Sequence, residues 1–333
     1  MRTRSVWALF AGLVVVVLAG LAAAAVWWQD TRPLLQSGGA VRLTVEAGTG
    51  VRGIARQLGT RRMIVHPILF SIVARLHGQT GRLQAGVYEI TPGMTARELL
   101  DRMVHGASVR DHIRFIEGWN LRQIRAALSA HPGLRHDSTD WTESQLLERL
   151  GAVGNHAEGL LFPDSYQFAA GSSDLVVLRQ AHARARSVLE RAWSERAPDL
   201  PVASPYEALV LASIVEKETG SAADRPRVAA VFLNRLRLGM RLQSDPTVIY
   251  GMGDAFDGNL RRSDLERDTP YNTYIRLGLP PTPVSSPGAA SIVAVVKPIA
   301  SKALFFVARG DGTSEFSETL AEHNRAVDRF QRR

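Results

Sequence analysis

Two carboxylates stand at the end of a strongly apolar helical pattern, within Glu216-Lys-Glu-Thr219. Ser204-Pro-Tyr-Glu207 predicts where this helix starts, because serine is a common N-cap, proline suits the first helical position, and a glutamate three residues after the cap completes the signal. Nearly every residue from 208 to 215 is apolar, so we expect a helix that is buried on most sides. Gly220 is the expected end of the helix.

The helical period allows either acid to project from this apolar helix into a cleft. Glu218 continues the stripe of Leu211 and Ile214, whereas Glu216 continues the stripe of Leu209. Apolar surroundings raise the pKa of a carboxyl group, which then remains a proton donor near neutral pH. The spacing leaves a second interpretation open, in which both acids are surface residues at a fraying helix end.

The amino-terminal segment predicts where the protein resides. Val6 to Trp28 is a run of 23 uncharged, mostly apolar residues, and such a helix covers a hydrocarbon core of roughly 30 Å. Arg2 and Arg4 precede it, which predicts a cytoplasmic tail (1–5), a transmembrane helix (6–28) and a linker (29–40). We expect a single-pass membrane protein whose remaining residues are exported. The alternative is a cleaved signal peptide, for which Ala22 to Ala25 offers small residues.

A strand, a turn and a helix recur after the linker. Val41 to Val45 alternates like a strand before a helical pattern, and Val87 to Ile90 begins a second copy. A third copy is expected to begin at His112 to Ile116. These units predict small α+β packing.

Composition excludes several classes of site. The chain has no cysteine, which excludes a thiol nucleophile and a thiolate metal site, and its histidines lack metal-ligand spacing. Gly48-Thr-Gly50-Val-Arg-Gly53 matches a dinucleotide motif, but no acid follows between Glu46 and Glu89, so we interpret it as a turn and expect no cofactor. Lys and Arg number 40 against 32 acidic residues, but they are dispersed, so we expect no nucleic acid partner.

Several segments in register resemble the endolytic murein transglycosylases, the YceG-like family. The resemblance covers nearly the whole chain. The segments are Ala212-Ser-Ile-Val-Glu-Lys-Glu-Thr219, Val231-Phe-Leu-Asn-Arg-Leu236, Met240-Arg-Leu-Gln-Ser-Asp-Pro-Thr-Val-Ile-Tyr250, Tyr271-Asn-Thr-Tyr274, Leu279-Pro-Pro281 and Glu322-His-Asn324.

The resemblance implies an α+β fold with a transmembrane helix, a LysM-like α+β module (41–165) and a mixed α+β catalytic domain (166–333). It implies a membrane-anchored enzyme that cuts peptidoglycan glycan strands internally, between N-acetylmuramic acid and N-acetylglucosamine, and leaves 1,6-anhydro ends. The family's catalytic acid corresponds to Glu218, with Glu216 as a supporting carboxylate. Implied partners are glycan strands, the cytoplasmic membrane and peptidoglycan synthases.

Amide, carboxylate and phenol groups suit sugar hydroxyls, and aromatic faces pack on pyranose rings. We therefore expect the substrate to contact Gln243, Asp245, Tyr250, Tyr271, Asn272 and Tyr274. Asp245 before Pro246 is alternatively an N-cap, and Tyr250 is alternatively a core residue. Ser314 stands where many family members carry a histidine.

Two other functions fit the same residues. A muramidase would hydrolyse the same bond, and it would need a water-activating carboxylate such as Asp245 or Glu216 near Glu218. A non-catalytic glycan-binding scaffold of the wall-synthesis machinery is the third interpretation.

Overall fold

The computed structural model describes residues 2–46, 48–106 and 109–331, which form two compact units. The first unit contains the described residues up to Asp111 together with Phe168–Ser172, and the second contains His112–Gln167 and the described residues from Ser173 onward. The fold is mixed α+β with an N-terminal apolar helix, as the sequence predicts.

The units do not follow the expected division after residue 165. Residues 112–167 pack with the C-terminal part of the chain instead. The backbone shows this directly, because Gly118 N–H donates to the Ser286 carbonyl at 2.9 Å and Ser286 N–H donates to the Trp119 carbonyl at 2.7 Å.

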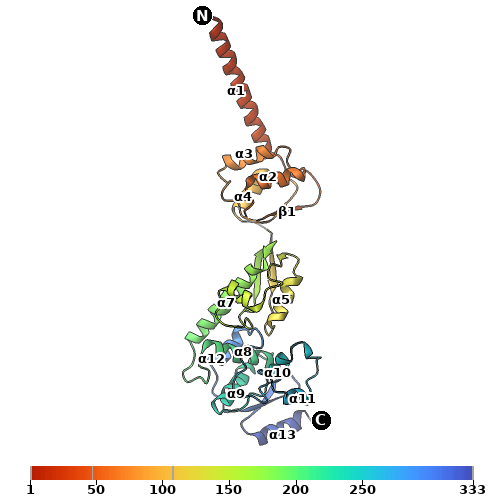
Figure 1. The fold of residues 1–333 in the computed structure, drawn as a ribbon, viewed down its shortest axis with the longest axis vertical. Coiled ribbons are helices and arrows are strands. Elements are labelled where there is room, and N and C mark those ends of the chain that lie inside the picture. Colours follow the sequence, from red (N-terminus) through yellow and green to blue (C-terminus); the bar gives the residue numbers. More distant parts are fainter. Residues whose placement is uncertain (1, 47, 107–108, 332–333) are drawn as a thin grey trace. The chain divides into compact units, whose positions relative to one another are not determined.

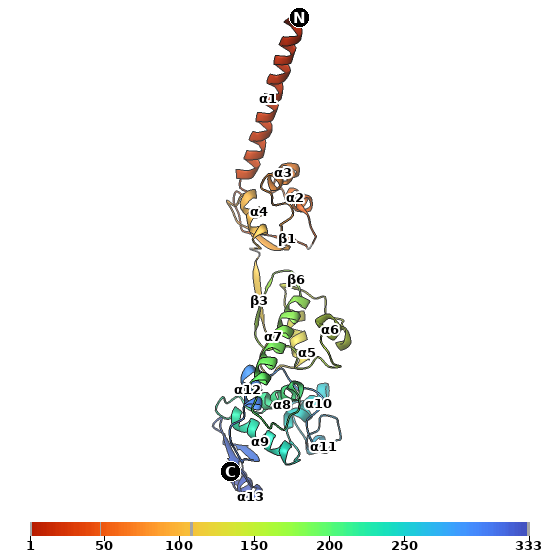
Figure 2. The ribbon, with the colours of Figure 1, turned by 90° about the vertical axis from the view of Figure 1, so that its left-hand side faces the viewer.

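The first unit joins helices to one two-stranded antiparallel sheet (Figures 1 and 2). Its elements are α1 (Arg2–Thr31), β1 (Val41–Val45), α2 (Val51–Thr60), α3 (Pro67–Leu76), β2 (Gly86–Ile90) and α4 (Ala96–Val104). In the sheet Val41 pairs with Ile90 and Val45 pairs with Gly86. Leu43, Phe70 and Tyr88 lie in its buried core, so the alternation of the sequence places the expected face inward.

Local signals account for most of these elements. The strand expected over 41–45 is confirmed, and Gly48 takes a positive φ of 83° in the turn before α2. The sequence analysis did not identify α3. Its short run of nearly continuous apolar residues gives no period that separates a helix from a strand.

Helix α1 contains a segment, Leu13–Thr31, that is long and apolar enough to cross a membrane. Length and composition fit a membrane anchor and a signal sequence equally. The last turns of α1 pack on the first unit, where Val26 contacts the core and Gln29 is buried.

The remaining elements belong to the second unit, apart from residues 110–111 and 168–172, which belong to the first. They are β3 (Arg110–Arg114), α5 (Leu121–Ala130), β4 (Leu134–Arg135), α6 (Glu143–Leu150), β5 (Ser165–Ala169), β6 (Ser172–Ser173), α7 (Asp174–Ser194), α8 (Pro205–Glu218), α9 (Arg225–Arg237), α10 (Asp245–Met252), η1 (Gly253–Ala255), α11 (Arg262–Glu266), α12 (Ala289–Val296), β7 (Phe305–Ala308), β8 (Ser314–Ser317) and α13 (Leu320–Phe330). Strand β3 pairs with β5, β4 with β6, and β7 with β8. The expected third copy therefore does not repeat the β1–β2 arrangement, because the strand of that copy pairs with β5.

Helix α8 (Figure 1) contacts α7, α9, α10 and α12. Every residue from Ala208 to Val215 is buried. Its start is confirmed, because the Ser204 side chain accepts a hydrogen bond from Glu207 N–H at 3.1 Å. The helix ends at Glu218, before the expected Gly220, since Thr219 is extended. Glu218 is thus the last helical residue.

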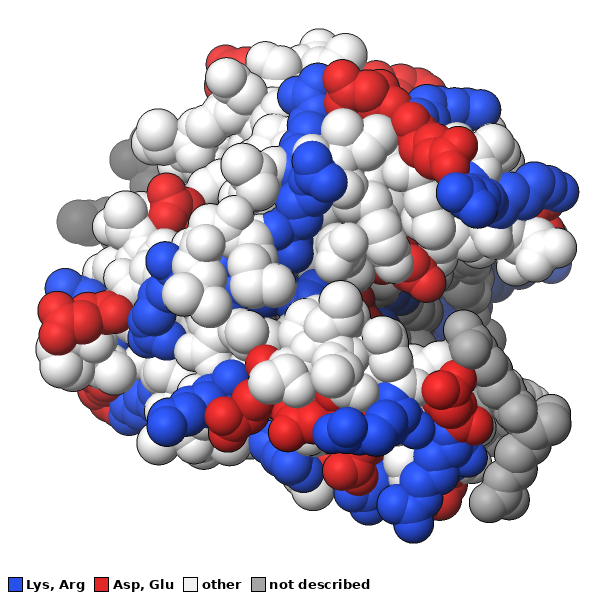
Figure 3. Space-filling view, turned by 90° about the horizontal axis from the view of Figure 1, so that it is seen from below, with Lys and Arg blue, Asp and Glu red and all other residues white. Residues whose placement is uncertain are grey.

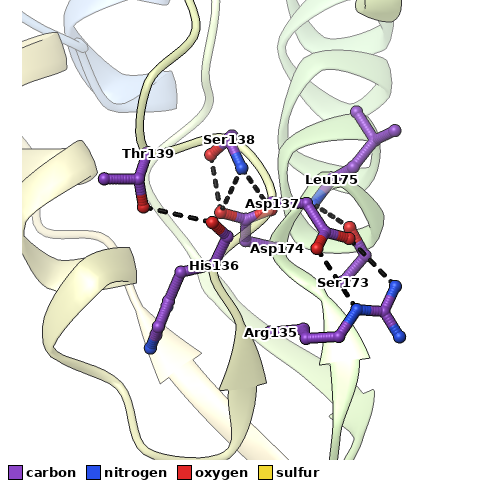
Figure 4. Close-up of polar contacts among 8 residues, drawn as sticks. All are labelled: Arg135, His136, Asp137, Ser138, Thr139, Ser173, Asp174 and Leu175. Atoms are coloured by element: carbon purple, nitrogen blue, oxygen red, sulfur yellow. Dashed lines mark hydrogen bonds and ion pairs between the residues drawn. The ribbon is translucent and has the colours of Figure 1, made fainter.

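A buried carboxylate fixes the start of α7 (Figure 4). Asp174 accepts hydrogen bonds from Ser138 N–H at 3.2 and 3.1 Å and from Ser138 Oγ at 2.6 Å. Arg135 and Asp137 pair through two hydrogen bonds, at 3.2 and 2.9 Å, in the same loop. These contacts attach the 135–139 loop to a helix that packs on α8.

Ser213→Ala tests the attachment of the 284–285 segment to α8. The fully buried Ser213 Oγ donates to the Val210 carbonyl at 2.7 Å and accepts from Val284 N–H at 2.9 Å. Removing the hydroxyl leaves a buried N–H unpaired, so we expect the free energy of unfolding to fall by about 1–3 kcal/mol. Chemical denaturation measures it, and the exposed Ser194→Ala is the control. Equal effects of the two substitutions would contradict the assignment.

Candidate active-site cleft

The end of α8 opens into a cleft of about 590 Å³ within the second unit. Its walls come from α8, α9, the 242–245 segment, the β7–β8 hairpin and α13. The lining residues are Glu218, Phe232, Arg235, Leu242, Gln243, Asp245, Tyr274, Phe305, Phe306, Val307, Ala308, Ser314, Leu320, His323, Val327 and Gln331.

Glu218 enters this cleft from the C-terminus of α8. Ser244 Oγ donates a hydrogen bond to Glu218 Oε1 at 2.5 Å. Burial raises the pKa of Glu218 to about 7, and the negative charge of Asp245 adds to this, whereas the Ser244 hydrogen bond and the charge of Arg235 act against it. A carboxyl group with this pKa is protonated in a large fraction of molecules at neutral pH and can then accept a proton back. Glu218 thus projects into a cleft, which is the first of the two arrangements that the sequence leaves open.

Arg235 joins two walls of the cleft. Its side chain is buried, with Nη1 donating to the Leu242 carbonyl at 2.5 Å and Nε donating to the Leu304 carbonyl at 2.8 Å. The sequence analysis assigned no role to Arg235 or Ser244, although both lie inside the segments that carry the family resemblance. An arginine in an otherwise apolar helical stripe was the available signal.

Three expected contact residues line the same cleft as Glu218. Tyr274 Oη donates to Asp245 Oδ1 at 2.6 Å, which holds the two side chains together at the opening. Gln243 has a φ of 53°, a left-handed conformation that is uncommon for residues other than glycine and is found at functional sites. The N-cap interpretation of Asp245 is wrong, because Ser244 occupies that position.

Asn272 is fully buried and does not line this cleft. Its Nδ2 donates to the carbonyls of Leu265 at 3.0 Å and Arg267 at 2.7 Å, and its Oδ1 accepts from Tyr274 N–H at 2.9 Å. The expected substrate contact is therefore corrected. Asn272 orders the loop that presents Tyr274, because its amide supplies the hydrogen bonds that a loop backbone lacks.

Tyr250 and Tyr271 pack on each other away from the Glu218 cleft, with ring centroids 4.9 Å apart. Tyr271 Oη lies 2.9 Å from Thr282 Oγ1, and Tyr250 Oη donates to Glu158 Oε2 at 3.1 Å. Tyr250 and Glu158 line a second cleft of about 440 Å³. Neither tyrosine is part of the lining of the Glu218 cleft.

Glu158 is a second buried acid, which the sequence analysis did not single out. Burial raises the pKa of Glu158 to about 7. Its carboxylate accepts hydrogen bonds from Leu121 N–H at 3.1 and 3.0 Å and from Gly159 N–H at 3.2 Å. Leu121 is the first residue of α5, so Glu158 satisfies a donor that a helix N-terminus leaves unpaired, whereas Gly159 is its own neighbour in the chain.

Glu216 lies outside the lining of the Glu218 cleft. Its Oε2 accepts from Gly288 N–H at 2.9 Å and from Ser291 Oγ at 2.7 Å, and Arg225 Nη2 lies 3.8 Å from its Oε1. Glu216 therefore joins the end of α8 to the start of α12 and does not support Glu218 directly.

Aromatic and imidazole groups form the wall made by β7 and α13. The His323 ring stacks on Phe305 with centroids 5.2 Å apart, and burial lowers the pKa of His323, aided by the charge of Arg235. Ser314 also lines this cleft, and its N–H donates to Asp224 Oδ2 at 2.7 Å. His323, whose lowered pKa favours the neutral imidazole, and Ser314 thus line the same cleft as Glu218.

Among the described residues, no group of three or more His, Asp or Glu side chains could hold a metal ion. Figure 3 views the side of the molecule toward α9, α11 and α13, and acidic and basic side chains are interspersed over this face.

Glu218→Gln tests the burial of the acid through stability. The ordinary pKa is 4.5 and the folded value is about 7, so the stability that the protonated form provides is present below pH 4.5 and is lost as pH rises through 7. The amide of glutamine is neutral at every pH, so the variant does not lose this stability as pH rises. We expect the variant to gain on the order of 2 kcal/mol over the native protein at pH 8 and nothing at pH 4.

Thermal unfolding of the detergent-solubilised chain at both pH values measures this difference. The exposed Glu190→Gln serves as the control and is expected to change stability at neither pH. A Glu218→Gln variant that is less stable than the native protein at pH 8 would contradict the burial.

The YceG-like family model matches residues 43–329. An endolytic murein transglycosylase of Bacillus subtilis is 30% identical, over 87% of this chain and 84% of the relative. A Streptococcus pneumoniae protein of the same name is 28% identical over 86% of this chain, which spans only 58% of that longer relative. The crystal structure of a YceG-like protein from Listeria monocytogenes is 29% identical, with a TM-score of 0.54, over 87% of this chain and 99% of that one. Since the family match extends over most of its length, the chain belongs to the YceG-like family.

Proposed function

We propose that the protein is an endolytic lytic transglycosylase of peptidoglycan, anchored in the inner membrane by α1 with its catalytic region in the periplasm. The names of its relatives support murein as the substrate. The observation that carries the proposal is the carboxyl group of Glu218, which has a pKa of about 7 and lies in an open cleft.

Glu218 acts twice in the proposed reaction. Its carboxyl proton moves to the glycosidic oxygen as the bond from that oxygen to C1 of N-acetylmuramic acid breaks. The carboxylate then takes the proton of the C6 hydroxyl as O6 bonds to C1. The acid is regenerated, water is not consumed, and the strand ends in a 1,6-anhydro sugar.

The neighbours of Glu218 fit these two steps. Ser244 donates to Oε1, which leaves Oε2 to carry the transferred proton. The fixed charge of Arg235 stabilises the carboxylate that forms between the steps. Gln243, Asp245 and Tyr274 supply the polar groups that would bind sugar hydroxyls along the cleft.

Hydrolysis of the same bond is the second candidate. Asp245 is the carboxylate that shares the cleft with Glu218, and a muramidase needs such a group to activate water. Tyr274 Oη, however, donates a hydrogen bond to Asp245 Oδ1. A carboxylate that already accepts a strong hydrogen bond is a weaker proton acceptor. We therefore favour the intramolecular attack by the C6 hydroxyl.

We also propose that the first unit binds glycan as a LysM-like module. The order of strand, two helices and strand from β1 to β2, with the strands antiparallel, supports this assignment. Peptidoglycan synthases as partners stay a prediction of the family resemblance.

Glu218→Gln is expected to lower kcat by at least about 10³-fold on purified glycan strands, because an amide cannot donate the proton. Glu216→Gln is the matched control, two residues away, and should retain most activity because Glu216 lies outside the cleft. Separation of products by strand length measures both. Full activity of Glu218→Gln, or loss only in Glu216→Gln, would overturn the assignment.

Ser244→Ala tests the tuning of the acid. kcat/KM of the native protein should fall as pH rises through about 7, when Glu218 loses its proton. Removing the Ser244 hydroxyl destabilises the Glu218 carboxylate, so the pKa of Glu218 rises. The decline of kcat/KM at high pH then shifts upward by about one pH unit. Ser194→Ala, at an exposed hydroxyl, should leave the profile unchanged. A decline of kcat/KM that stays at the same pH or shifts to lower pH would contradict this role of Ser244.

A further inference from the structure

Helix α3 exposes a stripe of large apolar side chains. Ile68 and Leu76 are 75% and 71% exposed, and Ile72 lies between them on the same helix face. The opposite face of α3 is buried through Phe70 and Val73. An exposed apolar stripe of this kind marks an interaction surface rather than ordinary solvent contact.

A groove of about 800 Å³ between α2 and α3 adjoins this stripe. Arg52, Arg56 and Arg75 line it together with Ile68 and Ile72, and no acidic residue is part of its described lining. Guanidinium groups bind phosphate oxygens through paired hydrogen bonds, and their charge favours an anionic ligand. The lining of the groove thus combines apolar and cationic side chains.

The end of α1 lies against the same part of the first unit. Asp30 Oδ2 is 3.3 Å from Nε2 of His77, the residue that directly follows α3, and Gln29, next to Asp30 in the chain, is buried. Arg32 stacks over the Trp28 ring at 4.5 Å, and tryptophan and arginine gather where a membrane helix leaves the bilayer. If α1 spans the membrane, this contact holds α3 close to the membrane surface.

We propose that α3 and the α2–α3 groove dock on the anionic phospholipid surface of the membrane in which α1 is anchored. The apolar stripe enters the boundary between headgroups and acyl chains, and the three arginines bind lipid phosphates. The first unit is then fixed against the bilayer by a second contact besides α1. This inference rests on the proposed anchor, and the test separates the two.

The absence of cysteine allows a single reporter to be placed anywhere in the full-length chain. In the first variant, Ile68→Cys, the new cysteine carries an environment-sensitive fluorophore. The protein is reconstituted into vesicles of phosphatidylcholine and phosphatidylglycerol whose acyl chains carry a quencher. Leu18→Cys, within α1, reports the anchor. Thr44→Cys, exposed on β1 at the end of the unit away from α1, is the control (Figure 1).

We expect strong quenching at Leu18 and Ile68 and little at Thr44. Quenching at Leu18 with Ile68 no more quenched than Thr44 would overturn the docking and leave the anchor standing. Little quenching at Leu18 would overturn both. If the emission of the fluorophore at position 68 changed with protein concentration and not with the quencher, a second copy of the chain would cover α3. That result would overturn docking on lipid.

The arginines are tested by charge removal. Arg56→Gln with Arg75→Gln should reduce quenching at Ile68 at least twofold in the anionic vesicles, and so should vesicles of phosphatidylcholine alone. Arg186→Gln with Arg191→Gln removes the same charge from α7 and should change nothing. Equal quenching at Ile68 in neutral and anionic vesicles would overturn the preference for an anionic lipid surface.

Discussion

The carboxyl group of Glu218 is held at the end of a helix that the rest of the second unit buries. Desolvation disfavours its charged form, while Ser244 and Arg235 favour it, and the balance leaves a pKa of about 7. Helices α7, α9, α10 and α12 surround α8 and thereby create the apolar environment on which this balance depends. Packing in this unit therefore sets the acidity of one group.

Two glutamates in one helical turn have separate roles because residues two apart point to different sides of a helix. Glu216 faces the start of α12, where backbone and hydroxyl donors satisfy it. Glu218 faces the cleft, where Ser244 donates to one of its oxygens. The same geometry gives one acid a structural task and leaves the other able to exchange a proton.

Local sequence signals predicted the helix of Glu218 because capping chemistry and apolar period are encoded within a few residues. They also indicated the polar residues Gln243, Asp245 and Tyr274, which line the cleft. They did not separate these from Asn272 and Tyr250, since burial of an amide or a phenol depends on segments distant in sequence. The Glu158 carboxylate that pairs with Tyr250 lies 92 positions away, which no local pattern reveals.

The most direct test of the central claim, that Glu218 alone supplies the proton donor and the base, is digestion of purified glycan strands in heavy-oxygen water followed by mass spectrometry. The account predicts ends that are one water lighter than a reducing end and carry no solvent oxygen, at a broad spread of strand lengths from the earliest times. Labelled reducing ends would contradict it, because a second carboxylate must then activate water, and Asp245 would be the first residue to replace.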